Sequence, residues 1–299
     1  MVLGKVAPMK APAFAYARAT SINGALELLS EHGERARLLS GGQSLLPAMN
    51  LRLISPEIVI DIGDLAELRG IVVGDGLLRI GALTRHVELQ GSTQIESLAP
   101  LLTEAVRHVA HPAVRNRGTI GGSLAQADPA AELPACMLAL DATIVVRGQR
   151  GERRIAAGDF FQGIFATALS AEELLVSVEL PIVRAPSTHF FHEFARRHGD
   201  YALAGVAAHA TMDGQVLSEL RMAFFAVADR PVLAKAASRL LNVAVTPALI
   251  SDAAEAFGDE LDPPEDPQAS ADLRRHLGKV LFRRCAEALT TAGSVGALR

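Results

Sequence analysis

Two short segments combine glycines with hydroxyl side chains, which suits them to binding a phosphate group. The first is LLSGGQSLL, residues 38–46, and the second is NRGTIGGSLAQADPAA, residues 116–131. Glycine lets the backbone turn sharply and lets a ligand approach the amide N–H groups. Successive N–H groups in such a turn attract anions. We therefore expect the two segments to grip a single dinucleotide pyrophosphate from both sides.

The common nucleotide-binding motifs do not explain these segments. Neither the spacing G-x-G-x-x-G nor the P-loop pattern G-x-x-x-x-G-K-[ST] occurs, which argues against Rossmann and P-loop sites. One Gly-Gly pair alone is more often a tight turn without a ligand. Asp128 and Glu132 follow the second segment, where their carboxylates can accept hydrogen bonds from ribose hydroxyls or an adenine amine.

Length and composition limit the class of protein. The chain has 299 residues, a formal net charge of −4 and 49% hydrophobic residues, which suits two domains, or one large domain, with a substantial core. The mildly acidic net charge argues against nucleic-acid binding, which needs a clustered basic face. No stretch approaches the roughly 20 apolar residues of a membrane span, and residues 1–19 lack a secretory core, so we expect a cytoplasmic protein. Met9 resembles a second start, and residues 1–8 are interpreted as an extension.

The side chains that usually carry redox metals or catalysis are scarce. Cys136 and Cys285 are the only two cysteines, whereas an iron–sulfur cluster needs about four thiolates. Any such cluster must therefore belong to a partner. His108 and His111 have a ligand-like spacing, but no third ligand is evident. We predict no metal site and no catalytic acid, base or nucleophile in this chain.

The local patterns predict mixed helices and strands, an α+β class. Ser21 is expected to cap a helix that Gly33 ends, and Gly74-Asp75-Gly76 to join two strands. The remaining predicted helices cover residues 98–110, 133–140, 234–241, 246–257 and 272–292. The remaining predicted strands cover residues 35–40, 57–62, 142–147, 174–180, 189–195, 203–212 and 219–227, with a domain boundary within residues 182–188.

Four stretches together carry a family resemblance. They are SGGQSLLPAMNLRL (40–53), NRGTIGGSLAQADPAAELPA (116–135), LLVSVELP (174–181) and GDYALAGVA (199–207). In this order and spacing, the chain closely resembles the FAD-binding medium subunit of the xanthine dehydrogenase and carbon monoxide dehydrogenase family of molybdenum hydroxylases.

The resemblance implies a two-domain α+β fold. Residues 9–183 would form a vanillyl-alcohol-oxidase (PCMH)-type FAD-binding domain with two lobes, divided near residues 60–65. Residues 184–299 would form a smaller α+β domain of the carbon monoxide dehydrogenase flavoprotein type.

The resemblance also implies which residues bind FAD. Those at the pyrophosphate would be Leu38, Leu39, Ser40, Gly41, Gly42, Gln43, Ser44, Leu45, Thr119, Ile120, Gly121, Gly122 and Ser123. Glu132, with Asp128 as a close competitor, matches a carboxylate near the adenosine half, and Leu175 matches a residue beside the adenine. Asp200 and Tyr201 would lie near the isoalloxazine, and Val109 completes the set. Gln43 stands where some carbon monoxide dehydrogenases have histidine, so non-covalent FAD is expected.

The implied function is an electron relay. A large partner subunit would hold the molybdenum cofactor and a small one two [2Fe–2S] clusters, in a dimer of heterotrimers. This chain would take electrons onto FAD and pass them to an external acceptor. Two alternatives stay open: a self-contained flavin-dependent oxidase or dehydrogenase of the same fold, and a non-enzymatic FAD-binding assembly protein.

Overall fold

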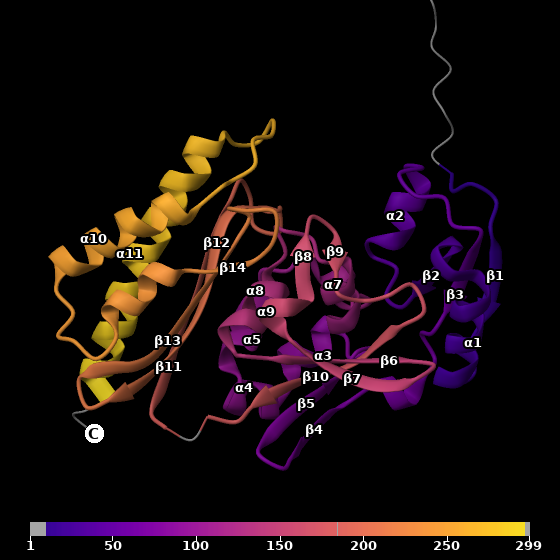
Figure 1. The fold of residues 1–299 in the computed structure, drawn as a ribbon, viewed down its shortest axis with the longest axis horizontal. Helices are drawn as coiled ribbons and strands as arrows, with labels where there is room; N and C mark the ends of the chain where they lie inside the picture. Colours follow the sequence, from indigo (N-terminus) through magenta and orange to yellow (C-terminus); the bar gives the residue numbers. More distant parts are fainter. Residues whose placement is uncertain (1–9, 184, 297–299) are drawn as a thin grey trace, which may run out of the picture.

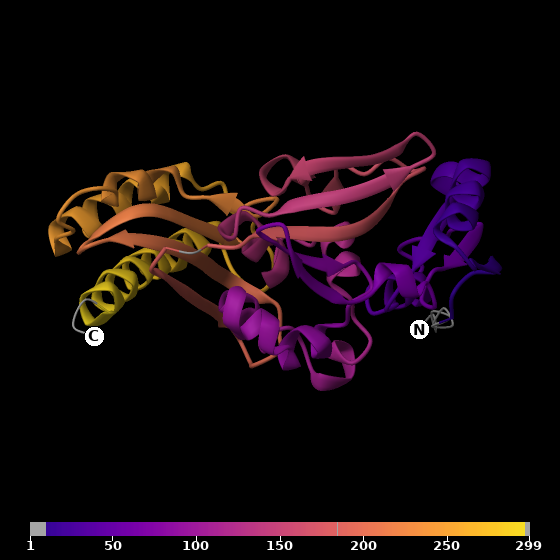
Figure 2. The same ribbon diagram turned by 90° about the horizontal axis from the view of Figure 1, so that it is seen from below.

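Three larger sheets follow one another along the long axis of the molecule (Figure 1). The structure is a computed structural model and describes residues 10–183 and 185–296. The extension proposed for residues 1–8 lies outside the described residues. Figure 2 shows the same row from below, with the N-terminal lobe at one end and the C-terminal helices at the other.

The first lobe is a small parallel sheet covered by one helix. Its strands β1 (Ala15–Arg18), β3 (Ile58–Asp61) and β2 (Ala36–Leu39) pair in that order. Helix α1 (Ile22–His32) begins where Ser21 Oγ accepts a hydrogen bond from Gly24 N at 3.0 Å, and it ends at Gly33 with φ 53°. Both ends confirm the prediction, because the serine cap and the glycine stop are local signals.

The second lobe is a five-stranded antiparallel sheet with helices on one face. Its strands, in order, are β4 (Ile71–Gly74), β5 (Leu77–Gly81), β10 (Leu174–Pro181), β6 (Thr143–Gly148) and β7 (Gly151–Ala156). Asp75 and Gly76 both have positive φ and form the predicted tight turn between β4 and β5. The lobe's helices are α3 (His86–Gly91), α4 (Thr93–Leu98), α5 (Pro100–Val106), α6 (Pro112–Arg115), α7 (Ile120–Gln126), α8 (Glu132–Ala139) and α9 (Ala157–Phe160).

The single helix predicted over residues 98–110 is wrong in its extent. Helix α4 ends at Leu98 and α5 begins at Pro100, with Ala99 between them at φ −146° and ψ 57°. Proline disfavours helical geometry in the residue before it. The apolar periodicity of the sequence therefore continues across Ala99, although the helix itself is interrupted there.

The C-terminal part is a four-stranded antiparallel sheet between two helical layers. Its main strands are β11 (Ser187–Ala195), β12 (Ala202–Asp213) and β13 (Val216–Phe225), followed by the short β14 (Val232–Leu233). One face packs on α5 and α8, and the other packs on α10 (Pro247–Glu260) and α11 (Ala271–Gly296) (Figure 1).

Two details of the C-terminal region differ from expectation. The segment predicted as a helix over residues 234–241 is a 3₁₀ helix, Lys235–Leu240. Helix α10 extends three residues further than the expected end at residue 257, to Glu260, whose carboxylate accepts hydrogen bonds from the Lys235 and Ala236 N–H groups. The three main strands overlap the predicted segments, although β13 begins three residues before the expected start at residue 219 and ends two residues before the expected end at residue 227.

Candidate functional site

The two glycine segments meet although they are far apart in the chain. Ser40 follows β2 and Thr119 precedes α7, and their hydroxyl oxygens lie 3.2 Å apart. A Cβ atom at Gly41 would stand 2.2 Å from the Arg117 carbonyl oxygen, and one at Gly122 would stand 2.9 Å from both hydroxyl oxygens. Such distances exclude a larger side chain, so the close approach of the segments depends on glycine.

The first segment offers unpaired backbone donors. Among the described residues, no acceptor takes a hydrogen bond from the N–H groups of residues 41–44. Gly42 has φ 72°, which turns the chain here, and Gln43 Nε2 donates to the Gly41 carbonyl oxygen at 3.0 Å. A run of free N–H groups in a turn attracts an anion. This geometry suits a phosphate group.

The second segment works differently from the sequence prediction. Gly121 and Gly122 lie in the first turn of α7 rather than in a loop, and Thr119 is the N-cap. The N–H groups of residues 120–122 already donate to the Thr84 and Ala82 carbonyl oxygens and to Thr119 Oγ1. The expectation that both segments present free N–H groups is therefore wrong for the second. It contributes space and hydroxyl groups, while the first contributes the amide donors.

A buried histidine, which the sequence interpretation did not single out, supports the second segment. His86 is 4% exposed, and its ring atoms would stand 3.0 Å from a Cβ at Gly118. Burial, together with the nearby Arg115 charge, lowers the pKa of His86 to about 4, so the ring is neutral at physiological pH. No local signal marks this residue, because its position follows from the way α3 packs against the second segment.

Thr119→Val tests the hydroxyl contact between the segments. Valine keeps the shape but removes both the bond to Ser40 and the cap on the Gly122 N–H group. We expect a loss of about 1 kcal/mol in the free energy of unfolding, typical of an N-cap deletion, together with weaker FAD retention. Chemical denaturation and flavin release measure the two effects, and Thr119→Ser should restore both. Wild-type stability in Thr119→Val would refute the cap's contribution.

A second group of predicted residues gathers around two carboxyl groups. Burial, followed by the charges of Glu193 and Asp128, raises the pKa of Glu132 to about 8. Burial also raises the pKa of Asp128, whose Oδ1 accepts a hydrogen bond from Ala130 N at 2.9 Å. The Tyr201 residue is 64% exposed, but partial burial of its phenol group, followed by the charges of Asp128 and Glu132, raises the phenol pKa. Glu132 thus keeps its proton at neutral pH.

The raised pKa of Glu132 predicts how stability depends on pH. The folded chain retains this proton up to about pH 8, whereas the unfolded carboxyl loses it near 4.5. Its stabilising contribution is therefore fully present below pH 4.5 and is lost as pH rises towards 8. We expect Glu132→Gln to remove this fall in the free energy of unfolding across that window. Chemical denaturation at several pH values measures the free energy of unfolding, and Glu172→Gln, at an exposed position, is the control. If the free energy of unfolding depends on pH in the same way in the wild type and in Glu132→Gln, the raised pKa of Glu132 is refuted.

The other predicted residues occupy different environments. Val109 follows α5 near the loop that carries Asp200 and Tyr201, since a Cβ at Gly199 would stand 3.0 Å from the neighbouring Ala110 carbonyl oxygen. Asp200 is exposed. Leu175 lies at a bulge of β10, and its side chain is buried in the core rather than displayed beside the glycine segments. The FAD contacts of these residues stay predictions.

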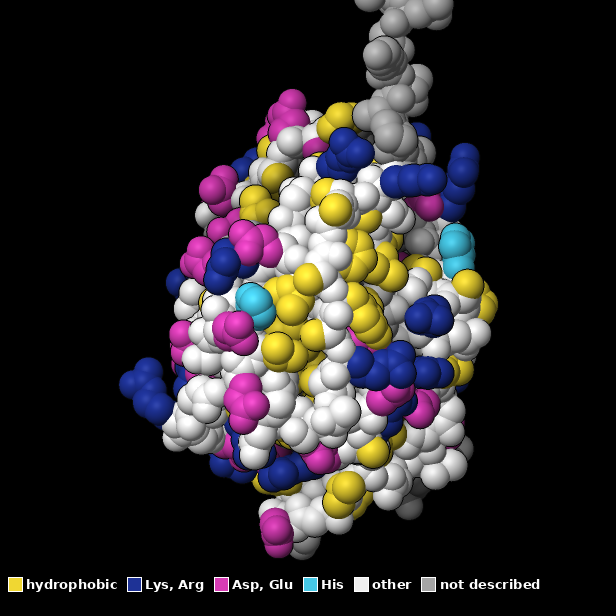
Figure 3. Space-filling view, turned by 90° about the vertical axis from the view of Figure 1, so that its right-hand side faces the viewer, with side chains coloured by type: hydrophobic (Ala, Val, Ile, Leu, Met, Phe, Trp, Pro, Cys, Tyr) yellow, Lys and Arg dark blue, Asp and Glu magenta, His cyan; other side chains and the backbone are white. Residues whose placement is uncertain are grey.

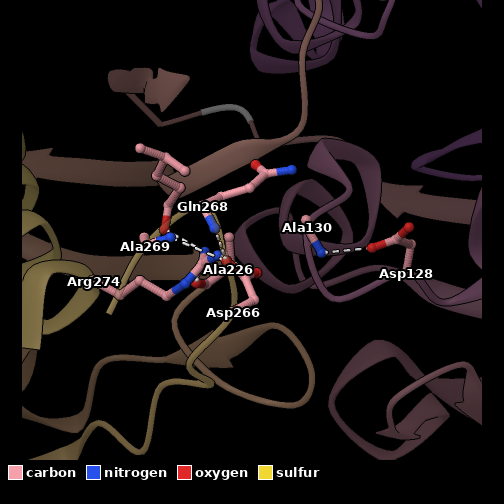
Figure 4. A network of polar contacts seen from close by, with 8 residues as sticks. Asp128, Ala130, Ala226, Asp266, Gln268, Ala269 and Arg274 are labelled. Atoms are coloured by element: carbon pink, nitrogen blue, oxygen red, sulfur yellow. Dashed lines mark hydrogen bonds and ion pairs between the residues drawn. The ribbon is translucent and has the colours of Figure 1, made fainter. Parts of the chain in front are cut away.

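Arg274 of α11 connects the C-terminal region to the Asp128 segment. Its guanidinium donates to the carbonyl oxygens of Leu203 (2.8 Å) and Ala226 (3.0 Å) and to Asp266 Oδ2 (2.7 Å). Ala226 N in turn donates to the Pro129 carbonyl oxygen at 2.8 Å. Figure 4 shows this network beside the turn in which Asp128 accepts from Ala130. The buried Arg274 side chain is thus linked through Ala226 to Pro129, in the turn that borders the Asp128 carboxyl group.

These features together fit a dinucleotide: free N–H groups and two hydroxyls for the pyrophosphate, with carboxyl groups nearby for the polar groups of its other parts. Residues 12–183 match the model of the FAD-binding domain in molybdopterin dehydrogenase. The chain belongs to this family. Residues 189–289 match the carbon monoxide dehydrogenase flavoprotein C-terminal domain. The matches to these two family models confirm the predicted α+β fold and the predicted cofactor, FAD.

Known relatives of this FAD-binding protein are oxidoreductase subunits. The 6-hydroxypseudooxynicotine dehydrogenase complex subunit alpha of Paenarthrobacter nicotinovorans is 39% identical over 278 residues, covering 92% of this chain and 94% of the relative. The carbon monoxide dehydrogenase medium chain of Hydrogenophaga pseudoflava is 36% identical and covers 93% and 97%. The chain is thus an FAD-binding oxidoreductase subunit of the medium-chain type.

Solved structures agree with this assignment. Carbon monoxide dehydrogenase from Hydrogenophaga pseudoflava superposes with a TM-score of 0.91 at 36% identity, covering 93% of this chain and 98% of that one. Quinoline 2-oxidoreductase from Pseudomonas putida 86 gives 0.89 at 37% identity, covering 97% and 100%. Within residues 10–183 and 185–296, no helix has the length and apolar character needed to cross a bilayer.

Proposed function

We propose that this chain carries FAD non-covalently and relays electrons within a molybdenum hydroxylase. It takes electrons from [2Fe–2S] clusters of a small partner subunit and passes them to an external acceptor. The observation that carries the proposal is the joined pair of glycine segments, with free N–H groups in residues 41–44 beside the Ser40 and Thr119 hydroxyls. FAD supplies the redox chemistry, and the protein binds and orients it.

Each group of residues has a role in this proposal. Leu38 to Leu45 and Thr119 to Ser123 hold the pyrophosphate, and Glu132 or Asp128 bonds the adenosine half. The exposed ring of Tyr201 covers one face of the isoalloxazine by offset stacking. We further propose that residues 9–183 form the FAD domain and residues 184–299 the second domain.

The proposed partners are a large molybdenum subunit and a small iron–sulfur subunit, in a dimer of heterotrimers. The two cysteines of the sequence are both buried, and two thiolates cannot build an iron–sulfur cluster alone. Figure 3 shows hydrophobic side chains gathered on the N-terminal end of the molecule. Leu46, Leu51 and Leu53 around α2 (Leu45–Asn50) are exposed, and Leu53 is 74% exposed. An apolar surface of this kind supports a protein partner next to the first glycine segment.

The visible absorption spectrum of the purified protein, before and after acid precipitation, tests the proposal. Flavin bands near about 370 and 450 nm, released by acid as FAD, are expected for a non-covalent flavoprotein. Iron–sulfur absorbance with co-purifying large and small subunits supports the relay. Turnover of an organic substrate by the chain alone would favour the self-contained oxidase. A colourless chain that cannot take up FAD would refute the proposal and leave the assembly role.

A further inference from the structure

The ring of His86 packs directly against the second glycine segment. His86 N donates to the Gly118 carbonyl oxygen at 2.9 Å, and Ile120 N donates to the Thr84 carbonyl oxygen at 3.0 Å. These two bonds align the chain around His86 with the segment. A Cβ atom at Gly118 would stand 3.0 Å from both Nδ1 and Cε1 of the ring. This edge of the imidazole therefore faces the glycine, with no side chain between them.

The same glycine also touches the first segment. A Cβ atom at Gly41 would stand 2.9 Å from Gly118 Cα. Gly41 is the first residue of the run 41–44, whose N–H groups have no acceptor among the described residues. The His86 ring, Gly118 and Gly41 thus follow one another in close contact. The position of the ring therefore helps to set how closely the two segments approach each other.

The polar character of His86 has no explanation in the packing of the chain. The residue is 4% exposed, and neither ring nitrogen has a hydrogen-bond partner within residues 10–183 and 185–296. A neutral imidazole carries one N–H donor and one acceptor nitrogen. Burying such groups without partners destabilises the folded state. An apolar side chain of similar size would give a more stable chain here, so the imidazole needs a reason other than stability.

We propose that His86 is a positioning residue of the FAD site, whose ring N–H bonds to the Thr119 carbonyl oxygen when the pyrophosphate is held between the two segments. This inference rests on the proposed function. The hydroxyl of Thr119 lies 3.2 Å from that of Ser40. A bond from His86 to the Thr119 backbone fixes the residue that presents this hydroxyl to the phosphate.

The surroundings of the ring favour this partner and a neutral donor. The Thr119 backbone already acts on the ring, because it raises the pKa of His86, although burial lowers that pKa more. The geometry still falls short of a hydrogen bond. The charge of Arg115 also lowers the pKa, and Arg115 Nη1 is held by the carbonyl oxygens of Val109 and Ala110 at 3.0 Å. The ring therefore offers one N–H donor without adding a charge.

Replacing the ring by an apolar side chain tests this role through two opposite effects. His86→Leu removes the unpartnered nitrogens, so the urea midpoint of the FAD-free chain should rise. FAD affinity should fall at least about 10-fold, as for the loss of one hydrogen bond. His86→Asn keeps a polar group near the Nδ1 position. It should bind FAD more tightly than His86→Leu, although its urea midpoint is lower.

Thr103→Val is the matched control. The Thr103 hydroxyl on α5 is buried and has no hydrogen-bond partner in the described part of the chain, but it belongs to neither glycine segment. Thr103→Val should raise the urea midpoint, as His86→Leu does, and leave FAD affinity unchanged. A His86→Leu chain that binds FAD like the wild type would overturn the proposal. So would a lowered urea midpoint in His86→Leu, because a structural role alone would then explain any loss of FAD.

Nitrogen-15 NMR of the histidine rings tests the bond itself. The His86 signals are identified by their loss in His86→Asn. Addition of FAD should shift the ring N–H signal of His86 and slow its exchange with solvent. An unchanged signal with FAD bound would overturn the proposal alone. A wild-type chain that takes up no FAD would overturn the proposed function as well.

Discussion

Gly41→Ala is expected to weaken FAD binding by at least about 100-fold, or about 2.7 kcal/mol. The added Cβ would stand 2.2 Å from the Arg117 carbonyl oxygen and 2.9 Å from Gly118 Cα, both backbone atoms that cannot rotate away. The two glycine segments must separate to relieve this contact. The free N–H groups of residues 41–44 would then no longer face the second segment. Titration of the apoprotein with FAD, followed by flavin fluorescence, measures the loss.

Gly158→Ala is the control for this variant. A Cβ at Gly158 meets nothing within 4 Å, so this exchange should leave both FAD binding and folding unchanged. Gly42→Ala serves as a graded variant, because the nearest contacts of its added Cβ are flexible leucine side chains, although φ 72° adds backbone strain. It should bind FAD better than Gly41→Ala. If Gly41→Ala binds FAD as tightly as the wild type, contact between the segments is not what forms the site.

Arg274→Ala is expected to lower the free energy of unfolding by about 3 kcal/mol. Arg274 is 4% exposed, and its removal leaves the Leu203 and Ala226 carbonyl oxygens without this donor. Each unsatisfied buried acceptor costs about 1–3 kcal/mol. The ion pair with Asp266 is lost as well. Urea denaturation followed by circular dichroism measures the change.

The neighbouring Arg275→Ala provides the comparison. Arg275 pairs with Asp272 one turn earlier on the surface of α11, and that partner is almost fully exposed. Such pairs contribute at most about 1 kcal/mol. Equal destabilisation by the two variants would show that burial of Arg274 is not the cause. Because Ala226 also bonds Pro129, Arg274→Ala should in addition alter the environment of Asp128.

Elements with complete local signals were predictable. The cap at Ser21, the stop at Gly33 and the turn at Asp75-Gly76 each depend on a few adjacent residues. Strand β7 has no such signal, because its sequence GERRIA is mostly exposed and charged. It is a strand because it pairs with β6 and because Arg154 reaches the buried Glu179 of β10. Tertiary pairing overrides its weak intrinsic preference.

For the site, the sequence alone determined the chemistry available: two glycine-rich segments with hydroxyls, two carboxyl groups after them, and too few cysteines for a cluster. It also determined the family, through the order and spacing of four stretches. The tertiary structure decided which donors are free, because α7 consumes the N–H groups of the second segment. It also brought His86 into place. Packing between distant elements sets how deeply each side chain is buried and which charges lie near it. Neither property can be read from the order of residues along the chain.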